Sequence, residues 1–183
     1  MASTALNAIA AQLEQAQQHY QSGNLAEAEA TYRQIAQQDP RQVEALFWLA
    51  LLADQSGRTQ DSVNYYEQVL AIQPNSAEAH GNLGSVLLKL GKVEGAIAHH
   101  RRALALMPEN AKAHYNLAIA LYEQKQDLEA IDLYRQAIAV QPDYANAHHN
   151  LGMALYRQGK PEEAIACYRQ AVELEPNHAS AHN

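Results

Sequence analysis

The chain has 183 residues, with 13 Lys and Arg against 20 Asp and Glu, and a formal net charge of −7. This acidic balance argues against a nucleic-acid partner, because nucleic-acid-binding proteins usually carry clustered Lys and Arg, and it disfavours contact with anionic membrane surfaces. A single cysteine, Cys167, excludes a disulfide framework and a cysteine-based zinc module, because a structural zinc ion needs four ligands.

Proline spacing shows how the chain is organised. Five of the six prolines recur every 34 residues, namely Pro40, Pro74, Pro108, Pro142 and Pro176. Alignment on these prolines divides most of the chain into five repeats, which are 9–42, 43–76, 77–110, 111–144 and 145–178. We expect residues 1–8 to extend the first helix, and residues 179–183 match the opening of a sixth, truncated repeat.

Each repeat contains two apolar stripes at helical spacing, as in residues 111–124 and 128–140, and is therefore predicted to be a helical hairpin. Positions are counted below from the first residue of each repeat. Position 15 is glycine in four repeats, which favours the left-handed conformation that ends a helix; these residues are Gly23, Gly57, Gly91 and Gly159. Lys125 takes that position in the fourth repeat, at an expected cost of about 1 kcal/mol at most.

Small residues recur at positions 8 and 20, where they are expected to let the two helices of a hairpin approach closely. Position 8 is Ala16, Ala50, Gly84, Ala118 and Gly152, and position 20 is Ala28, Ser62, Ala96, Ala130 and Ala164. A recurring leucine at position 7 and an aromatic residue at position 24 are expected to fill the core around them; the aromatic residues are Tyr32, Tyr66, Tyr134 and Tyr168. His100 takes the aromatic position in the third repeat.

This pattern of position-specific residues resembles the tetratricopeptide repeat, and the resemblance covers residues 9–178. It implies an all-α fold, a right-handed superhelical solenoid of helix-turn-helix units. In such a solenoid the first helices line a concave surface, which is the expected binding site for peptide or protein segments.

Three asparagines at position 6 are the first candidates for that site: Asn82, Asn116 and Asn150. An amide both donates and accepts hydrogen bonds, as recognition of an extended peptide backbone requires. Together with Tyr122 and Tyr156 at position 12, this ladder resembles the superhelical repeats of O-linked N-acetylglucosamine transferases, in which the asparagines grip the main chain of substrate proteins. Lys112 adds a cation at position 2. The alternative is that asparagine is simply an exposed polar residue of the repeat.

Residues 45–52 form the most apolar stretch and contain the only Trp and Phe. Phe47, Trp48 and Leu51 occupy positions 5, 6 and 9, on the expected binding face. We interpret them as a contact surface for a partner. The alternative is that the first repeat, residues 1–8 or a second copy covers this helix.

The histidines do not indicate a metal centre. His80, His114, His148 and His182 occur once per repeat, too far apart to share an ion, and are interpreted as packing residues. Only His178 and His182 have ligand spacing, and no third ligand is near them in the sequence, so they are weak candidates and no cofactor is expected.

No nucleotide-binding, metalloprotease or hydrolase motif is present, and Cys167 has no obvious histidine partner. No apolar run reaches the roughly 18 residues of a membrane helix, and no signal peptide is recognisable at the start. We therefore expect a cytoplasmic, non-catalytic protein.

The sequence thus predicts a protein-protein interaction module. By resemblance it is the peptide-recognition part of a larger protein such as a glycosyltransferase, with a catalytic domain outside this chain. The alternative is a structural scaffold that self-associates through an uncapped C-terminal end or through the Phe47/Trp48 surface, since a terminal repeat normally carries a polar capping helix.

Overall fold

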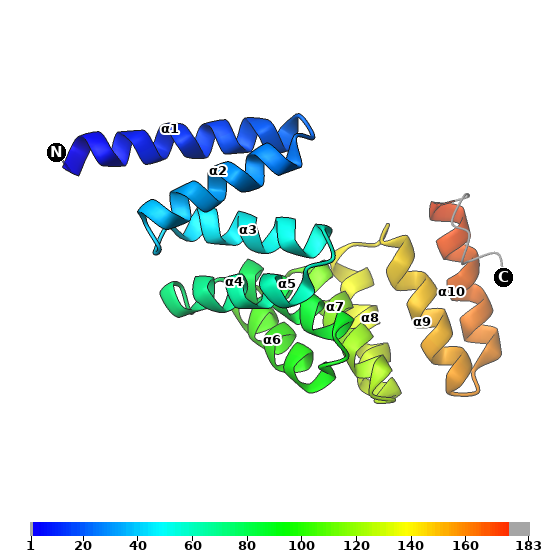
Figure 1. The fold of residues 1–183 in the computed structure, drawn as a ribbon. Helices are drawn as coiled ribbons and strands as arrows, with labels where there is room; N and C mark the ends of the chain where they lie inside the picture. Colours follow the sequence, from blue (N-terminus) through cyan, green and yellow to red (C-terminus); the bar gives the residue numbers. More distant parts are fainter. Residues whose placement is uncertain (1, 176–183) are drawn as a thin grey trace. The chain divides into compact units, whose positions relative to one another are not determined.

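The computed structural model describes residues 2–175, with side chains from residue 8 onward, and this part of the chain consists of helices joined by short turns (Figure 1). The helices are α1 (Ala2–Gln21), α2 (Leu25–Gln38), α3 (Val43–Gln55), α4 (Thr59–Ile72), α5 (Ala77–Lys89), α6 (Val93–Leu106), α7 (Ala111–Glu123), α8 (Asp127–Val140), α9 (Ala145–Arg157) and α10 (Pro161–Leu174). None of the described helices is both long and apolar enough to cross a membrane.

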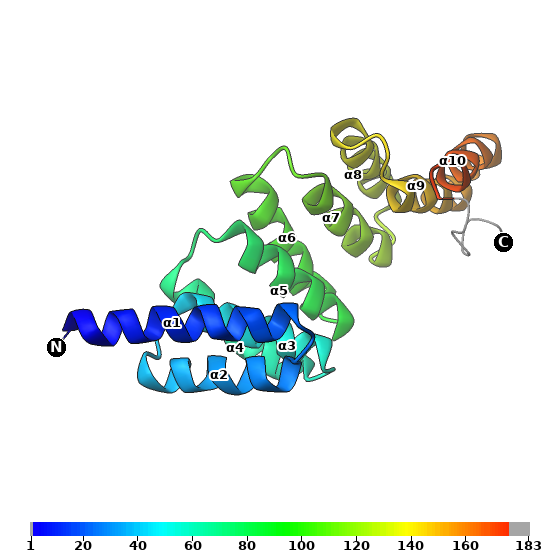
Figure 2. The same cartoon turned by 90° about the horizontal axis from the view of Figure 1, so that it is seen from above.

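The chain divides into two compact units, Met1–Leu90 and Gly91–Asn183. In the first unit, α1 packs on α2, α2 on α3, α3 on α4 and α4 on α5. In the second unit, α6 packs on α7, α7 on α8, α8 on α9 and α9 on α10 (Figure 2). Within each unit, consecutive helices therefore pack against one another, as expected for a solenoid of hairpins.

The hairpin turns confirm the prediction for position 15. The glycines there have φ between 70° and 78°, and Lys125 has φ of 60°. At the α9–α10 turn, the Gly159 amide donates to the Tyr156 carbonyl and the Lys160 amide to the Leu155 carbonyl, which is the hydrogen-bond pattern of a Schellman motif. The turn at Lys125 has the same pattern, so a non-glycine residue is accommodated without loss of the turn.

The small residues at positions 8 and 20 are all buried, as predicted. Gly152 shows why one of them must be small: a Cβ atom built on it would lie 2.6 Å from Cε1 of Tyr168. The leucines at position 7 are buried too, namely Leu49, Leu83, Leu117 and Leu151. Tyr32, Tyr66, Tyr134 and His100 complete the core at position 24.

Histidines at position 4 bind the loop between consecutive repeats. Their Nε2 atoms lie 2.8 to 3.1 Å from the carbonyl oxygen of the proline six residues earlier, in the pairs His80–Pro74, His114–Pro108 and His148–Pro142. Because a carbonyl only accepts, Nε2 carries the proton and donates. These histidines therefore act as packing and loop-binding residues.

Candidate functional site

A hollow of about 180 Å³ lies in the second unit between α7, α8 and α9. Its lining residues are Ile119, Tyr122, Glu123, Tyr134, Asn150 and Met153. The lining is largely apolar, with one amide and one carboxylate. This combination suits a peptide side chain together with the adjoining main chain.

Asn150 is a predicted site residue that lines this hollow, and hydrogen bonds hold its side chain in place. Its Nδ2 atom donates to the hydroxyl of Tyr115 across 3.0 Å, and its side chain also hydrogen-bonds the hydroxyl of Tyr134. Burial raises the pKa of Tyr134, so this hydroxyl stays protonated at neutral pH. A side-chain amide has two donor and two acceptor positions, so two hydrogen bonds orient Asn150 and two positions remain for a ligand.

The tyrosine-to-asparagine contact recurs between repeats, and the pattern within a single repeat does not predict it. Asn82, in the first unit, hydrogen-bonds the Tyr66 hydroxyl in the same way, from position 6 of one repeat to position 24 of the repeat before. Asn116 is half-buried in the second unit and follows a repeat with His100 at position 24. The sequence carries a signal for it, because tyrosine at position 24 is followed by asparagine at position 6 of the next repeat at two boundaries, Tyr66/Asn82 and Tyr134/Asn150. This pairing becomes visible only when consecutive repeats are compared.

The two predicted tyrosines at position 12 differ in their availability. The guanidinium carbon of Arg157 lies 3.4 Å from the centroid of the Tyr122 ring and covers it, while the Tyr122 carbonyl accepts a hydrogen bond from Arg157 Nη2. Arg157 also forms an ion pair with the buried Asp127, which lowers the pKa of that carboxyl. Tyr156 is 68% exposed, so its ring is available to a partner.

Lys112 is exposed in the first turn of α7 and does not line the α7–α9 hollow.

In the first unit, Trp48 packs against the first repeat. Its ring lies 4.6 Å from the ring of Tyr20 and 5.9 Å from that of Tyr32, with the second pair nearly parallel at 7°. Trp48 and Leu51 are both half-buried. This packing favours the interpretation in which the first repeat covers Trp48.

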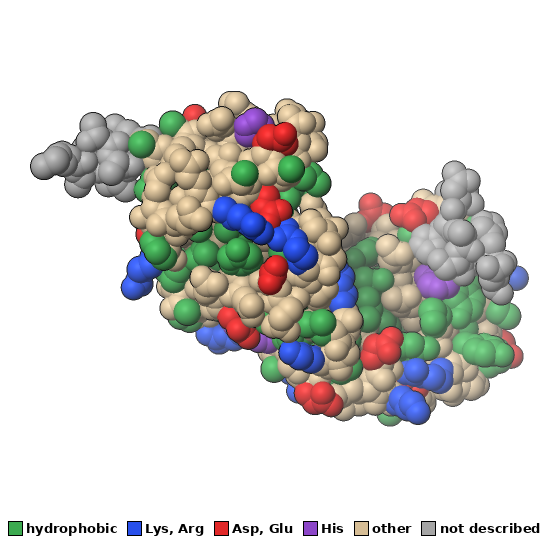
Figure 3. Space-filling model, viewed as in Figure 1, with side chains coloured by type: hydrophobic (Ala, Val, Ile, Leu, Met, Phe, Trp, Pro, Cys, Tyr) green, Lys and Arg blue, Asp and Glu red, His purple; other side chains and the backbone are tan. Residues whose placement is uncertain are grey.

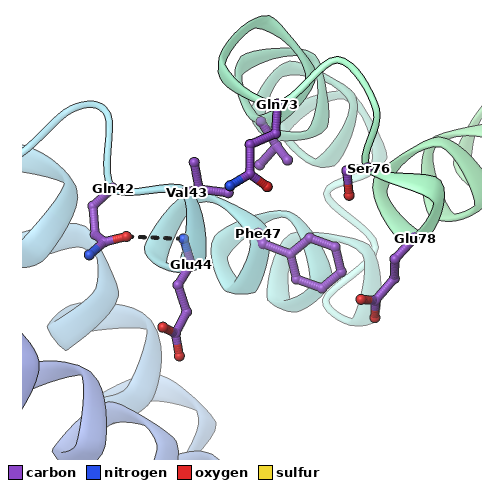
Figure 4. Close-up of a pocket in the computed structure, with 8 residues that line it drawn as sticks. Gln42, Val43, Glu44, Phe47, Gln73, Ser76 and Glu78 are labelled. Carbon is purple, nitrogen blue, oxygen red and sulfur yellow. Dashed lines mark hydrogen bonds between the residues drawn. The ribbon is translucent and has the colours of Figure 1, made fainter.

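Phe47 faces a second hollow, of about 320 Å³, which lies entirely in the first unit. Its ring meets the Tyr66 ring edge-on, with centroids 5.6 Å apart, and Figure 4 shows it near Ser76 and Glu78. The lining residues are Gln42, Val43, Glu44, Phe47, Val69, Gln73, Ser76 and Glu78. Of the predicted contact residues Phe47, Trp48 and Leu51, Phe47 lines this hollow.

Among the described residues, no cluster of three or more His, Cys, Asp or Glu side chains could hold an ion. The weak candidates His178 and His182 lie outside the described residues, as does the predicted start of a sixth repeat.

Consecutive helical hairpins in which each helix packs on the next within a unit define a helical-repeat protein. Sequence models of the tetratricopeptide repeat match residues 13–77, 65–98 and 145–178, and a TPR repeat model matches 84–125 and 120–159. The chain therefore belongs to the tetratricopeptide repeat proteins.

Solved structures show the same fold. A crystal structure of MamA is 26% identical, with a TM-score of 0.81 over 90% of this chain and 96% of that one. MamA from Desulfovibrio magneticus RS-1 is 24% identical, with a TM-score of 0.85 over 93% and 96% of the two chains. YrrB, described as a TPR protein with an unusual peptide-binding site, is 20% identical, with a TM-score of 0.79 over 93% and 88%.

A comparison with curated proteins finds no match. The finer resemblance to O-linked N-acetylglucosamine transferases is not shown by these comparisons, which establish the repeat family and the all-α fold.

Proposed function

We propose that this protein is an interaction module that binds an extended peptide segment on the α7–α9 surface, with Asn150 as the central contact. The observation that carries the proposal is the oriented Asn150 amide beside a largely apolar hollow. An amide held by two tyrosines loses little conformational freedom when a peptide binds, which favours affinity. YrrB, which shares the fold, is described as having a peptide-binding site.

The chemistry of the lining suggests what the segment offers. Ile119, Tyr134 and Met153 would surround an aliphatic side chain, whose burial contributes about 1.5 to 3 kcal/mol. Each hydrogen bond from Asn150 to the peptide backbone adds about 0.5 to 1.5 kcal/mol. Micromolar affinity needs about 8 kcal/mol, so further contacts are required, and exposed Tyr156 is a candidate for one of them.

A catalytic role is not part of the proposal. Burial raises the pKa of the Cys167 thiol, which disfavours the thiolate that a nucleophile needs. Attachment to a larger enzyme such as a glycosyltransferase stays a proposal based on the asparagine ladder alone, and peptide binding does not depend on it.

The test begins with selection of binders from a random peptide library displayed on phage. Calorimetry then measures the affinity of the selected peptide for the wild-type protein and for the Asn150→Ala and Leu128→Ala variants. Leu128 is 71% exposed on α8 and serves as the matched surface control. We expect Asn150→Ala to weaken binding about tenfold, the equivalent of one to two hydrogen bonds. Equal affinities for Asn150→Ala and the wild type would overturn the proposal.

A second candidate, self-association, rests on α10. Ile165 is 50% exposed, whereas the residues at the same position of repeats two to four are buried, namely Val63, Ile97 and Ile131. Figure 3 shows hydrophobic side chains at the surface of α9 and α10. Light scattering after size-exclusion chromatography of Ile165→Asp tests this: a smaller mass than the wild type supports self-association through α10, and an equal mass at all concentrations contradicts it.

A further inference from the structure

The Phe47 hollow has a counterpart two repeats further along the chain, and the two can be compared residue by residue. Phe47 corresponds to Tyr115, and Ser76 corresponds to Tyr144, in each case 68 residues later. In the second unit, the Tyr144 ring packs on the Tyr115 ring, with centroids 4.8 Å apart and planes tilted by 41°. In the first unit, Ser76 carries no ring, and a hollow of about 320 Å³ lies against Phe47.

Tyr144 occupies a position that other repeats use for helix capping. The Ser76 hydroxyl accepts a hydrogen bond from the Ala79 amide at 3.2 Å, and Asn110 accepts one from Ala113 at 3.0 Å. Tyr144 makes no such bond at the start of α9. Its side chain therefore serves the ring contact in place of the cap, which shows that this part of a repeat accommodates an aromatic ring.

The environment of the Tyr144 ring is partly dehydrated, since burial raises the pKa of Tyr144 to about 12. An aromatic ring transferred from water into such a site gains apolar contact and a tilted ring-to-ring contact. In the first unit, Phe47 offers both the apolar contact and the ring-to-ring contact, and the ring of Tyr66 lies beside it.

The charge beside the two sites differs. Glu44 and Glu78 line the first-unit hollow, and the corresponding residues in the second unit are Lys112 and Asn146. Within the described part of the chain, neither Glu44 nor Glu78 forms an ion pair. An aromatic ligand of the first-unit hollow would therefore bind more tightly if the ligand carried a positive charge next to its ring.

We infer that the Phe47 hollow binds a Phe or Tyr side chain of a partner protein, presented by a peptide segment that carries Lys or Arg beside the aromatic residue. The ring would occupy the space against Phe47 that Tyr144 fills in the second unit, and the cation would lie near Glu44 and Glu78. This site is separate from the α7–α9 surface, so the inference does not rest on the proposed function.

The test uses three capped pentapeptides: Ala-Lys-Phe-Lys-Ala, Ala-Lys-Ala-Lys-Ala and Ala-Glu-Phe-Glu-Ala. Each is titrated into ¹⁵N-labelled full-length protein, and backbone amide shifts are followed in residues 42–47, 73 and 75–78. We expect the first peptide to bind about tenfold or more tightly than either of the others, and its affinity to fall as salt is added. Equal affinities for the three peptides, or shifts confined to other residues, would overturn the inference.

Two variants test the same site from the protein side. Ser76→Tyr copies the second unit and fills the hollow from within, and Glu44→Lys reverses a charge while leaving Ser76 in place. Each should weaken binding of the Lys-Phe-Lys peptide about tenfold or more, whereas Leu128→Ala should leave it unchanged. Unaltered binding in both variants would contradict the inference. If the wild type is a dimer and Ser76→Tyr is a monomer, the occupant is a second copy and a partner peptide is ruled out.

Discussion

The side-chain amide of Asn150 donates a hydrogen bond to the Tyr115 hydroxyl across 3.0 Å, from one repeat to the repeat before it. Tyr115 in turn packs on Tyr134, with ring centroids 5.9 Å apart, and Tyr134 is buried. The same amide therefore links the core to the surface hollow. A residue that was predicted only as a ligand contact also holds neighbouring repeats together.

A double-mutant cycle can measure this link. Asn150→Ala should lower the free energy of unfolding by about 1 to 3 kcal/mol, because two tyrosine hydroxyls lose a partner. Tyr115→Phe should lower it less. We expect a coupling energy of about 1 kcal/mol between the two changes in urea denaturation; strictly additive effects would show that the bond contributes nothing.

Gly152 is expected to be irreplaceable while Tyr168 is present. Gly152→Ala places a methyl group 2.6 Å from the Tyr168 ring, which must move, so we expect a loss of about 1 to 3 kcal/mol. In a Tyr168→Ala background the same change should be neutral or stabilising, because alanine stabilises a helix more than glycine does. A loss of equal size in both backgrounds would contradict this explanation.

Lys125 offers a stabilising change. It holds φ of 60° at a turn where the other repeats have glycine. Lys125→Gly should raise the free energy of unfolding by up to about 1 kcal/mol, because glycine adopts this conformation without steric strain. Gly159→Ala, at the equivalent turn of the fifth repeat, should have the opposite effect. Urea denaturation of both variants measures the two changes, and a destabilised Lys125→Gly would count against the argument.

His100 should make stability depend on pH. Burial, and secondarily the charge of His99, lowers the pKa of His100 from 6.5 to about 4. Between these pH values the unfolded chain binds a proton that the folded chain does not, so the free energy of unfolding falls as the pH falls from 6.5 to about 4. The full loss from this residue is about 3 kcal/mol.

The matched control for this prediction is His100→Tyr, because three other repeats carry tyrosine at position 24. Its unfolding free energy should fall less than that of the wild type between pH 7 and pH 5. Equal decreases would mean that His100 is not the group responsible.

The repeat arrangement was accessible from the sequence because it depends on local periodicity. The spacing of apolar residues predicts the helices, and the left-handed turn at Gly159 follows from residue type alone. Even the exception, Lys125, was located correctly.

The site was less accessible, because it depends on side chains from different repeats. Nothing in the periodicity indicates that Arg157 covers the Tyr122 ring or that Tyr144 packs on Tyr115. Trp48 illustrates the same limit: its position predicts the binding face, while its neighbours Tyr20 and Tyr32 decide how much of the ring is accessible. Only the positions of the contacting side chains distinguish these outcomes.

The Asn150 side-chain amide provides the most direct measurement of peptide binding. Its two ¹⁵N–¹H signals can be assigned by their loss in Asn150→Ala and followed while a library-selected peptide is added. We predict that these signals shift as peptide is added, and that the dissociation constant fitted to the shifts equals the one that calorimetry gives. Signals that stay in place when the peptide reaches saturation would contradict the account.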